Sequence, residues 1–396
     1  MKILFVANRV PYPPYRGDKL KIFNLASQLA EDHELHLITI AEDKQDLQYK
    51  GNLEPLFGQI QMVYLPSWKR KLNVIKSLWN GKPLQVSYFH SAKFATLLSK
   101  IDFNDYDAIH VQHLRMSQYF EKFVPQHAIL DLPDAFSLYW KRRKENATHI
   151  FLKLFNGFEQ KRLAKYENKM MPMFNLNLVC NEEDRAYFKL NIQGPVNVEL
   201  LPNGVDTNTF KPNKAARIPY RVLFTGNMNY APNVDGVQYF SSEIWPQVIK
   251  EIPNAQFIIA GQKPVASVLA LASQNIHVTG FIEDLAAEYT KAQILVAPLR
   301  FGAGTQNKVL EAMASAIPVI CTDIGFKGLR AEQGQGVFST TSSSEFAQKL
   351  IELLKDDELC HNVGLQGFEL IHKHFSWKSI SSLLIEFFNN ASKENK

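Results

Sequence analysis

The chain has 396 residues, of which 46% are hydrophobic and 21% charged, and its formal net charge is +5. This length makes two domains the natural expectation, and the composition is that of a soluble globular protein. No apolar run is long enough to span a bilayer, which excludes a transmembrane segment.

The three cysteines, Cys180, Cys321 and Cys360, lie far apart and have no metal-ligand spacing. We interpret them as reduced, mostly buried thiols of a cytosolic protein. Met1 to Val10 is apolar but short, and the prolines that follow argue against a signal peptide. The sequence therefore predicts a cytoplasmic protein.

The charge is uneven along the chain. Residues 1–212 hold 28 Lys and Arg against 22 Asp and Glu, a balance of +6, whereas residues 213–396 hold 16 against 17. A basic first half indicates an anionic partner. Its clusters are Lys69 to Lys71 and Lys141 to Lys144, although solvated surface charge also explains either cluster alone.

The N-terminal segment has the pattern of a βαβ unit. Lys2 to Ala7 and Glu34 to Ile40 predict buried strands, and Lys19 to Ala30 has helical spacing. Parallel strands joined by crossover helices indicate an α/β sheet. The unit lacks a Gly-x-Gly-x-x-Gly fingerprint, which argues against a dinucleotide site there.

The loop Arg9 to Asp18 follows the first strand, at the sheet edge where open sheets bind ligands. It contains Arg16 and Gly17, which we expect beside a bound ligand. The alternative is a surface loop with a turn glycine.

Further strands are predicted in the first half at Gln59 to Leu65, Ala108 to Gln112, Ala128 to Leu132, Asn175 to Cys180 and Val196 to Leu201. His113 lies at the end of one of them, where a side chain points towards a ligand, whereas His110 inside the strand belongs to the core. Asp131, Asp134 and Ser137 either contact an acceptor hydroxyl or cap the next helix, and capping is the default. Ser137 to Met171 is predicted helical, with breaks near Asn146 and Asn156.

The second half repeats the alternation of strands and helices after a polar, proline-containing linker at Lys211 to Pro219. Its strands are predicted at Arg221 to Thr225, Ala255 to Ala260, Ile276 to Thr279, Ile294 to Leu299, Val319 to Thr322 and Gly336 to Phe338. Trp377 to Phe388 is strongly amphipathic. Its polar face lacks the basic residues that a membrane-surface helix prefers.

A glycine loop between a strand and a helix is the feature most specific to function. Gly302 and Gly304 open the loop, Thr305 is a plausible N-cap, and Asn307 to Ala316 carry good helix formers. Backbone amides and the positive end of the helix dipole favour an anion at this point.

Lys308 and Glu311 refine that interpretation. Lys308 adds a positive charge within the first turn, where the dipole disfavours it, which suggests a ligand with more than one negative charge. Glu311 lies one turn further and can accept two hydrogen bonds from a ribose diol. The layout suits a nucleoside diphosphate, and the alternative is an ordinary strand-helix turn with solvated side chains.

The stretch resembles the donor site of retaining glycosyltransferases with the GT-B fold, in the large group 1 (family 4) type related to glycogen and sucrose synthases. In that family a Glu-x7-Glu pattern ends in Leu-Glu-Ala-Met-Ala, as Leu310 to Ala314 do here. Ala303 stands where the first Glu would be and Lys308 where a Pro is usual. The chain therefore resembles a sub-branch with Gly-x-Gly-Thr-x-x-Lys-x-Leu-Glu. Leu201 to Asp206 also resembles the Pro-Asn-Gly-Val-Asp stretch that closes the first domain of the family.

The resemblance implies an α/β fold of two Rossmann-like domains facing a cleft. Residues 1–210 would bind the acceptor, residues 211–372 the nucleotide-sugar donor, and residues 373–396 would form a helix that crosses back to the first domain. The implied activity is metal-independent sugar transfer of the hexosyltransferase type, with retention, from a UDP- or GDP-sugar to a glycan or lipid-linked acceptor. This fits bacterial cell-surface polysaccharide or glycolipid synthesis.

No cofactor and no nucleic-acid partner are expected, because the nucleotide sugar is a substrate. The basic first domain would rest near an anionic surface on the inner face of the cell membrane.

The resemblance also implies roles for individual residues. His113, Lys308 and Glu311 would belong to the catalytic centre, and Arg16, Gly17 and Asp134 to the acceptor side. The donor-binding residues would be Gly226, Asn227, Gly280, Phe281, Ile282, Gly302, Gly304, Thr305, Gln306, Asn307, Lys308 and Glu311. The loop Gly226 to Asn233 lacks the basic residues common in relatives, so Lys308 would supply that charge. For Gly280 to Ile282, the suggested nucleobase edge, the alternative is a plain strand exit.

Two other functions stay open at this point. One is a GT-B sugar-nucleotide epimerase or hydrolase. The other is a nucleotide-sugar-binding protein that has lost transfer, which the missing first Glu and the absent Arg-Lys pair allow. A dehydrogenase is disfavoured, because the glycine loop comes late in the chain and its helix carries Lys308 and Glu311.

Overall fold

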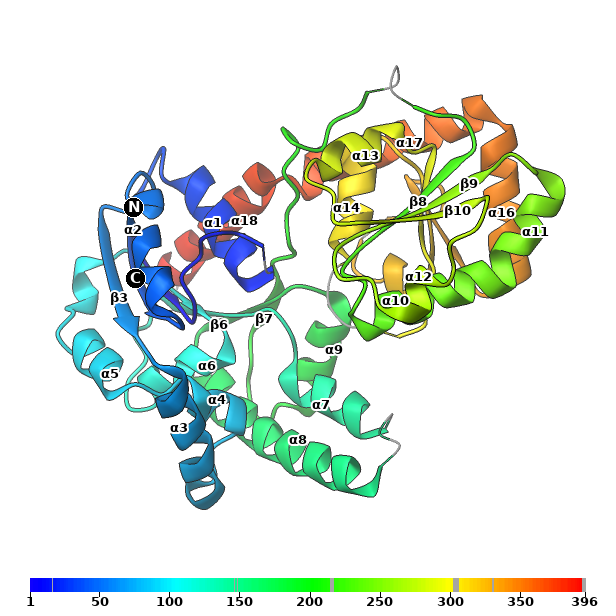
Figure 1. The fold of residues 1–396 in the computed structure, drawn as a ribbon. Helices are drawn as coiled ribbons and strands as arrows, with labels where there is room; N and C mark the ends of the chain where they lie inside the picture. The colour runs from blue at the N-terminus through cyan, green and yellow to red at the C-terminus, as the bar shows by residue number, and fades with distance from the viewer. Residues whose placement is uncertain are drawn as a thin grey trace. The chain divides into compact units, whose positions relative to one another are not determined.

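The structure is a computed structural model that describes residues 1–15, 17–145, 147, 149–213, 217–301, 306–329 and 331–393. The chain divides into two compact units (Figure 1). The first comprises Met1–Pro202 together with the described residues from Ile380 onward, and the second is Asn203–Ser379. Each unit is built on one parallel sheet, which confirms the predicted α/β class.

Within the described residues, the sheet of the first unit has seven strands in the order β3-β2-β1-β4-β5-β6-β7. Its pairings are parallel. The strands are β1 (Lys2–Ala7), β2 (Glu34–Ala41), β3 (Gln59–Tyr64), β4 (Ala108–Gln112), β5 (Ala128–Leu132), β6 (Leu176–Val179) and β7 (Val198–Leu200). The strand order reverses between β1 and β4, and open sheets bind ligands beyond the carboxyl ends of the strands at such a point.

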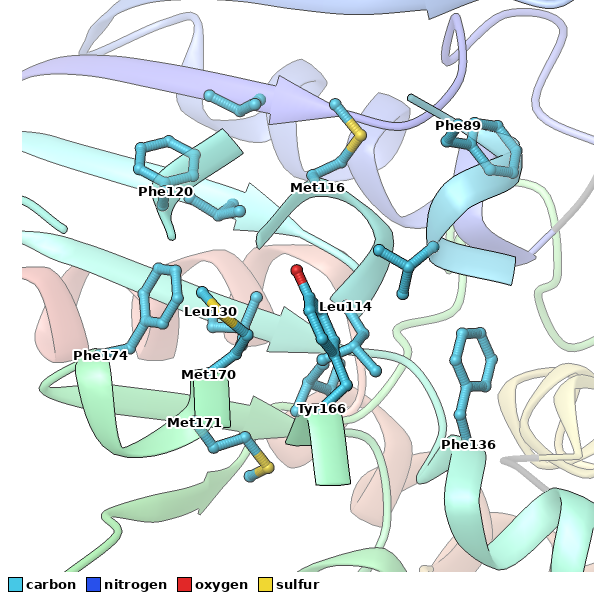
Figure 2. Close-up of a cluster of buried hydrophobic side chains, with 14 of the residues drawn as sticks. Phe89, Leu114, Met116, Phe120, Leu130, Phe136, Tyr166, Met170, Met171 and Phe174 are labelled. Atoms are coloured by element: carbon cyan, nitrogen blue, oxygen red, sulfur yellow. The ribbon is translucent and has the colours of Figure 1, made fainter. Parts of the chain in front are cut away.

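Helices cover this sheet, and β4 and β5 are buried at every residue, as expected for parallel strands covered on both faces. The helices are α1 (Gly17–Leu29), α2 (Lys50–Leu53), α3 (Ser67–Asn80), α4 (Leu84–Tyr88), α5 (Ala92–Leu98), α6 (Leu114–Ser117), α7 (Phe136–Glu145), α8 (Ile150–Met170) and α9 (Glu182–Asn191). Figure 2 shows part of the core, where Phe120 and Met116 lie near Phe174, Met170 and Tyr166. Side chains from α6, from α8 and from the short segments next to them therefore share one apolar layer.

The second unit has six strands within the described residues, in the order β10-β9-β8-β11-β12-β13 and again in parallel pairs. They are β8 (Arg221–Thr225), β9 (Gln256–Ala260), β10 (Ile276–Gly280), β11 (Ile294–Ala297), β12 (Val319–Thr322) and β13 (Val337–Thr340). Its helices are α10 (Ala231–Tyr239), α11 (Trp245–Glu251), α12 (Ala266–Leu269), α13 (Leu285–Lys291), α14 (Asn307–Ala314), α15 (Asp323–Phe326), α16 (Ser343–Lys355) and α17 (Asp357–His374). Here the strand order reverses between β8 and β11, so the loops that follow these two strands flank the predicted ligand position.

The last helix, α18 (Trp377–Lys393), is the amphipathic segment of the sequence. Its apolar residues Trp377, Ile380, Leu384 and Phe388 are all buried. The hydrophobic effect therefore holds this helix within the protein, and its apolar face is not a membrane-facing surface.

Two helix boundaries differ from those predicted. Asn156 does not break its helix: α8 runs through it, and its side chain donates a hydrogen bond of 2.9 Å to the carbonyl of Arg143 at the end of α7. The predicted break near Asn146 falls between α7 and α8, although Asn146 itself lies outside the described residues. Helix α14 ends at Ala314, earlier than expected, because Ala316 takes a left-handed conformation with φ of 53°.

The strand ends of the second unit meet tightly at two glycines. A Cβ on Gly261 would lie 1.6 Å from the carbonyl oxygen of Gly226. The Gly226 amide donates to Ala260 at 3.0 Å, and the Gly261 amide donates to Gly280 at 3.0 Å. Three neighbouring strands, β8, β9 and β10, therefore end at an edge that leaves no room for a side chain at Gly261.

This close approach predicts a large effect of a small substitution. Gly261→Ala places a methyl group on the Gly226 carbonyl, and we expect it to destabilise the protein by about 1–3 kcal/mol or to prevent soluble expression. Gly51→Ala is the control, since nothing lies within 4 Å of an added Cβ there. Thermal unfolding followed by circular dichroism compares the two, and similar melting temperatures for both variants would contradict the packing argument.

Candidate functional site

Lys308 is the centre of a polar cluster in the second unit. It lies in the first turn of α14 and is buried, and its Nζ donates a hydrogen bond of 2.8 Å to Oδ1 of Asn233 on α10. The ring of Phe224 on β8 lies 4.1 Å from Nζ, at cation-π distance. The Asn233 amide in turn donates to the carbonyl of Asn227 at 3.0 Å. A charge from α14 thus reaches the loop after β8, which has no basic residue of its own.

The environment of Lys308 changes its proton affinity. Burial lowers its pKa to about 7, and the nearby carboxyl of Glu311 opposes this only in part. The charged and neutral forms therefore coexist near neutral pH. An anion bound beside Nζ would favour the charged form.

Glu311 ends a chain of hydrogen bonds one turn along the same helix. The hydroxyl of Tyr289 on α13, which is fully buried, donates to Oε2 of Glu311 at 2.6 Å. The same Tyr289 oxygen lies 2.7 Å from the hydroxyl of Thr225 at the end of β8. Burial raises the pKa of Glu311, whereas Tyr289 and Lys308 lower it. These contacts hold one carboxyl oxygen of Glu311 in place.

The other predicted donor residues lie along the same strand ends. Gly226 and Asn227 follow β8, and Gly226 lies against Asn233, since a Cβ there would meet the Asn233 amide at 2.6 Å. Gly280 ends β10 with φ of 72°, and the next residue, Phe281, is 74% exposed. Ile282 packs against the core of the unit. Gly261 contacts both Gly280 and Gly226, and Gly226 lies against Asn233, the partner of Lys308. Gly280 therefore lies at the same edge of the sheet.

The glycine loop itself is only partly described. Gly302, Gly304 and Thr305 lie outside the described residues. Gln306 occupies the N-cap position of α14 with an extended backbone and makes no side-chain cap hydrogen bond. Within the described residues, Oδ1 of Asn307 is buried and has no hydrogen-bond partner. A buried acceptor without a donor at the start of this helix is a group that a ligand donor can satisfy.

Sequence reasoning missed three residues that position this cluster. Asn233 and Tyr289 hold Lys308 and Glu311, and Phe224 covers the ammonium group. Asn233 lies in the first turn of α10, directly after the loop that follows β8, so its position in the sequence could have indicated its role. Tyr289 comes from a helix 22 residues before Glu311, and no local pattern marks it.

In the first unit, His113 lies at the end of β4 in an unusual conformation. Its φ of 79° is rare for a residue with a side chain, and such strain often accompanies functional positions. The ring is buried against Phe136 with centroids 4.6 Å apart, and the Arg115 amide lies 3.5 Å from Nδ1. Burial, with the charges of Arg115 and Arg9, lowers the pKa of His113 well below its usual value. The imidazole is therefore neutral at physiological pH.

Arg115 adds a positive charge that has no direct carboxylate partner among the described residues. It donates to Gln85 at 2.8 Å and lies between the rings of Phe89 and Phe136, 4.8 Å and 5.3 Å from their centroids. Its Nε is buried without a hydrogen-bond partner within the described residues. Burial and the nearby Arg9 lower the pKa of Arg115 to about 10. Sequence analysis did not assign this residue, although it follows His113 by two positions.

Of the residues predicted for the acceptor side, the structure describes Gly17 and Asp134, both in the first unit. Asp134 follows β5, and burial raises its pKa while Arg115 lowers it. Gly17 begins α1, and a Cβ there would meet nothing within 4 Å, so no close contact inside the unit requires glycine. Asp18 pairs with Arg9 at 2.5 Å. Arg16 lies outside the described residues.

Asp131 on β5 and Ser137 on α7 were each predicted either to contact an acceptor hydroxyl or to cap a helix, and both have partners inside the first unit. Asp131 is buried and accepts hydrogen bonds from Lys21 at 2.8 Å and His110 at 3.1 Å, so it is an internal ion pair and contacts no acceptor. Ser137 is neither an acceptor contact nor a cap. It is buried inside α7, where its amide donates to Glu167 at 3.0 Å.

The three cysteines are buried, as expected. In the part of the chain that the structure describes, no group of three or more His, Cys, Asp or Glu side chains is placed to hold a metal ion.

The comparison with protein families identifies the second unit. Residues 219–356, which contain β8 to β13 and α14, match the profile described as Glycosyl transferases group 1. The second unit belongs to the group 1 glycosyltransferases. The match includes Asn233, Tyr289, Lys308 and Glu311.

Solved structures match over nearly the whole chain. Sucrose-phosphate synthase from Thermosynechococcus elongatus is 16% identical, with a TM-score of 0.69 and 98% of each chain covered. Alr3699/HepE of Anabaena, solved in complex with UDP, is 14% identical, with a TM-score of 0.65, covering 98% of this chain and 100% of the other. These likenesses show that the chain has the GT-B fold.

Two curated relatives are similar in sequence. An uncharacterised 44.6 kDa protein in the cps region of Klebsiella pneumoniae is 23% identical, over 97% of this chain and 99% of the relative. A GDP-mannose-dependent α-(1-6)-phosphatidylinositol monomannoside mannosyltransferase of Mycobacterium tuberculosis is 24% identical, over 49% of this chain and 56% of the relative.

The lowered pKa of Lys308 predicts a pH-dependent stability. An unfolded lysine has a pKa of about 10.4, so folding disfavours the charged form, and the cost grows as the pH falls from about 10 to 7. We expect nucleotide-free Lys308→Met to be more stable than the parent by ~1–3 kcal/mol at pH 6.5, with the difference disappearing towards pH 10. Urea unfolding at several pH values measures this. Lys250→Met, at an exposed position, is the control, and a pH-independent difference for Lys308→Met would disprove the shift.

Proposed function

We propose that this chain transfers a sugar from a UDP- or GDP-sugar to a glycan or lipid-linked acceptor, with retention of anomeric configuration. The observation that carries the proposal is the buried Lys308, held by Asn233 over the loop after β8, with Glu311 one turn away. A buried cation beside glycine-lined strand ends fits a diphosphate, and a fixed carboxylate fits a ribose.

In the proposed donor domain of residues 211–372, different residues would bind the diphosphate, the ribose and the nucleobase of the donor. Lys308 would contact the diphosphate. Negative charge develops on the diphosphate as its bond to the sugar breaks, so Lys308 would stabilise the transition state more than the bound donor. The free oxygen of Glu311 would accept from the ribose, while Gly280 to Ile282 would lie along the nucleobase. Asn227 and the glycine loop would complete the phosphate contacts.

The first unit, proposed as the acceptor domain of residues 1–210, would supply the groups that face the sugar and acceptor. His113 would position the transferred sugar through a neutral ring, which suits hydrogen bonding and not covalent attack. During transfer, the bond between the anomeric carbon and the diphosphate breaks and the acceptor oxygen bonds to the same carbon. The proton of that oxygen passes to the departing diphosphate. Gly17, Arg16 and Asp134 would face the acceptor.

The relatives support a place in cell-surface synthesis. One lies in a cps region, and another uses GDP-mannose and a phosphatidylinositol acceptor. We therefore propose that the product belongs to a bacterial surface polysaccharide or glycolipid, made without a metal ion. Transfer by the purified protein, screened over UDP- and GDP-sugars by mass spectrometry, tests the proposal. Free sugar without transfer would indicate a hydrolase, and nucleotide binding without turnover would indicate a binding protein.

Glu311→Gln tests the nucleotide assignment. The substitution keeps the shape but removes the charge that strengthens hydrogen bonds to the ribose, so affinity for UDP or GDP should fall by ~1.5–3 kcal/mol, about 10-fold to 150-fold. Calorimetric titration measures it. Glu243→Gln, at an exposed position of the same unit, is the control. Equal affinities for Glu311→Gln and the parent protein would remove Glu311 from the site.

His113→Ala tests the sugar-positioning role. We expect turnover to fall at least 10-fold while nucleotide affinity stays within about 2-fold, because His113 belongs to the first unit and the nucleotide contacts to the second. His149→Ala, at an exposed position, is the control. Normal rates of both transfer and donor hydrolysis in His113→Ala would assign the residue a structural role alone.

A further inference from the structure

Large apolar side chains are exposed on two helices of the first unit. On α3 they are Trp68, Leu72, Ile75, Leu78 and Trp79, with exposed fractions between 41% and 80%. On the first half of α8 they are Ile150, Phe151, Leu152, Leu154, Phe155 and Phe158, with exposed fractions between 45% and 82%. Single exposed apolar residues are normal, but such a concentration marks an interaction surface. We call these eleven residues the apolar surface.

The apolar residues of α3 form one stripe. Trp68, Leu72, Ile75 and Trp79 are spaced by four, three and four residues, which places them on one side of a helix. The buried residues of α3, Arg70 and Ser77, lie on the opposite side. The helix thus attaches to the unit by its polar side and turns its apolar side to the solvent, the reverse of an ordinary surface helix.

Helix α8 continues the apolar surface beside the end of α3. The guanidinium of Arg162 on α8 hydrogen-bonds the carbonyls of Ser77 and Gly81, at the C-terminal end of α3. The Phe158 ring lies 4.8 Å from the same guanidinium, so the exposed part of α8 begins next to α3. Figure 1 shows both helices along one edge of the first unit. Residues from distant parts of the sequence therefore meet where the two helices join.

The charged side chains within residues 67–80 and 150–158 are all basic. Residues 67–80 contain four Lys and Arg and no acidic residue, and Lys69, Lys71 and Lys76 are exposed. Lys153 lies exposed within the apolar part of α8. Lysine is depleted in protein interfaces, whereas Lys beside Trp, Phe and Leu is typical of helices that lie in the headgroup region of a membrane. The composition therefore favours an anionic bilayer over a protein partner.

The basic clusters noted in the sequence contribute less than their charge suggests. Arg70 is buried and bonds Glu42 at 2.7 Å, so Lys69 to Lys71 is not a surface cluster of three charges. Arg142 pairs with Glu183. Attraction by charge alone is thereby weakened, and the hydrophobic residues become the larger source of membrane affinity.

We propose that the apolar surface of α3 and α8 inserts into the headgroup region of an anionic phospholipid bilayer, with Lys69, Lys76 and Lys153 at the phosphates. In this proposal the two helices lie in the plane of the interface, as amphipathic helices on membrane surfaces do. Among the described residues, no helix is long and apolar enough to cross a membrane. The proposal deepens the proposed function, on which it rests for its purpose, because such attachment brings the first unit to a lipid-linked acceptor.

The test uses the full chain and vesicles of phosphatidylcholine, with and without phosphatidylglycerol. The parent protein should float with anionic vesicles, and its fluorescence should be quenched by brominated lipid, since Trp68 and Trp79 enter the interface. Trp79→Ser combined with Phe151→Ser should reduce the bound fraction at least 10-fold. Leu190→Ser combined with Phe123→Ser, at positions 84% and 65% exposed outside the surface, should bind as the parent does.

Three results would overturn the proposal. One is flotation of the Trp79 and Phe151 double variant at the parent level. Another is failure of the parent to bind anionic vesicles at low salt. The third is a parent dimer that this variant converts to a monomer, since a second copy would then cover the surface. Melting temperature and UDP or GDP binding of each variant verify folding. Nucleotide binding and donor turnover measured without vesicles test the glycosyltransferase proposal alone. A failure of that proposal can therefore be told apart from a failure of the membrane proposal.

Discussion

The hydrogen bond between Lys308 and Asn233 is the interaction around which the candidate site of the second unit is organised. A lysine ammonium is costly to bury, and a lysine at the start of a helix also opposes the helix dipole. Asn233 and the ring of Phe224 compensate this cost in part, and the lowered pKa of Lys308 reports the remainder. An unfavourable placement retained inside a folded domain indicates a group kept ready for a ligand.

Glu311 and Lys308 lie on the same helix but are held by different elements. Tyr289 from α13 holds Glu311, while Asn233 from α10 holds Lys308. The two contacts fix the helix start between the loops that follow β8 and β11. The tight approach of Gly261 to Gly226 then keeps backbone, not side chains, at the neighbouring strand ends. Hydrogen bonds to Lys308 and Glu311 and close backbone packing therefore hold the described part of the site in place.

The sequence predicted the two parallel sheets well, because buried parallel strands are continuous apolar runs and need no long-range information. It also predicted His110 as a core residue, correctly, from its place inside a strand. It failed where distant contacts decide the outcome. Asn156 looks like a helix breaker but bonds the preceding helix, and Arg70 looks like surface charge but pairs internally with Glu42. Tyr289 could not be foreseen, since only the folded chain brings it to Glu311.

Arg162 has a consequence for how the chain would meet a flat partner. By joining α8 to the end of α3, the Arg162 side chain would hold two apolar segments together, so that both can bind the same partner. Once one segment is bound, the other is held at a high effective concentration near the partner. Each segment alone can therefore bind weakly and reversibly. The protein would then attach and detach as a unit, and could visit many acceptor molecules in succession.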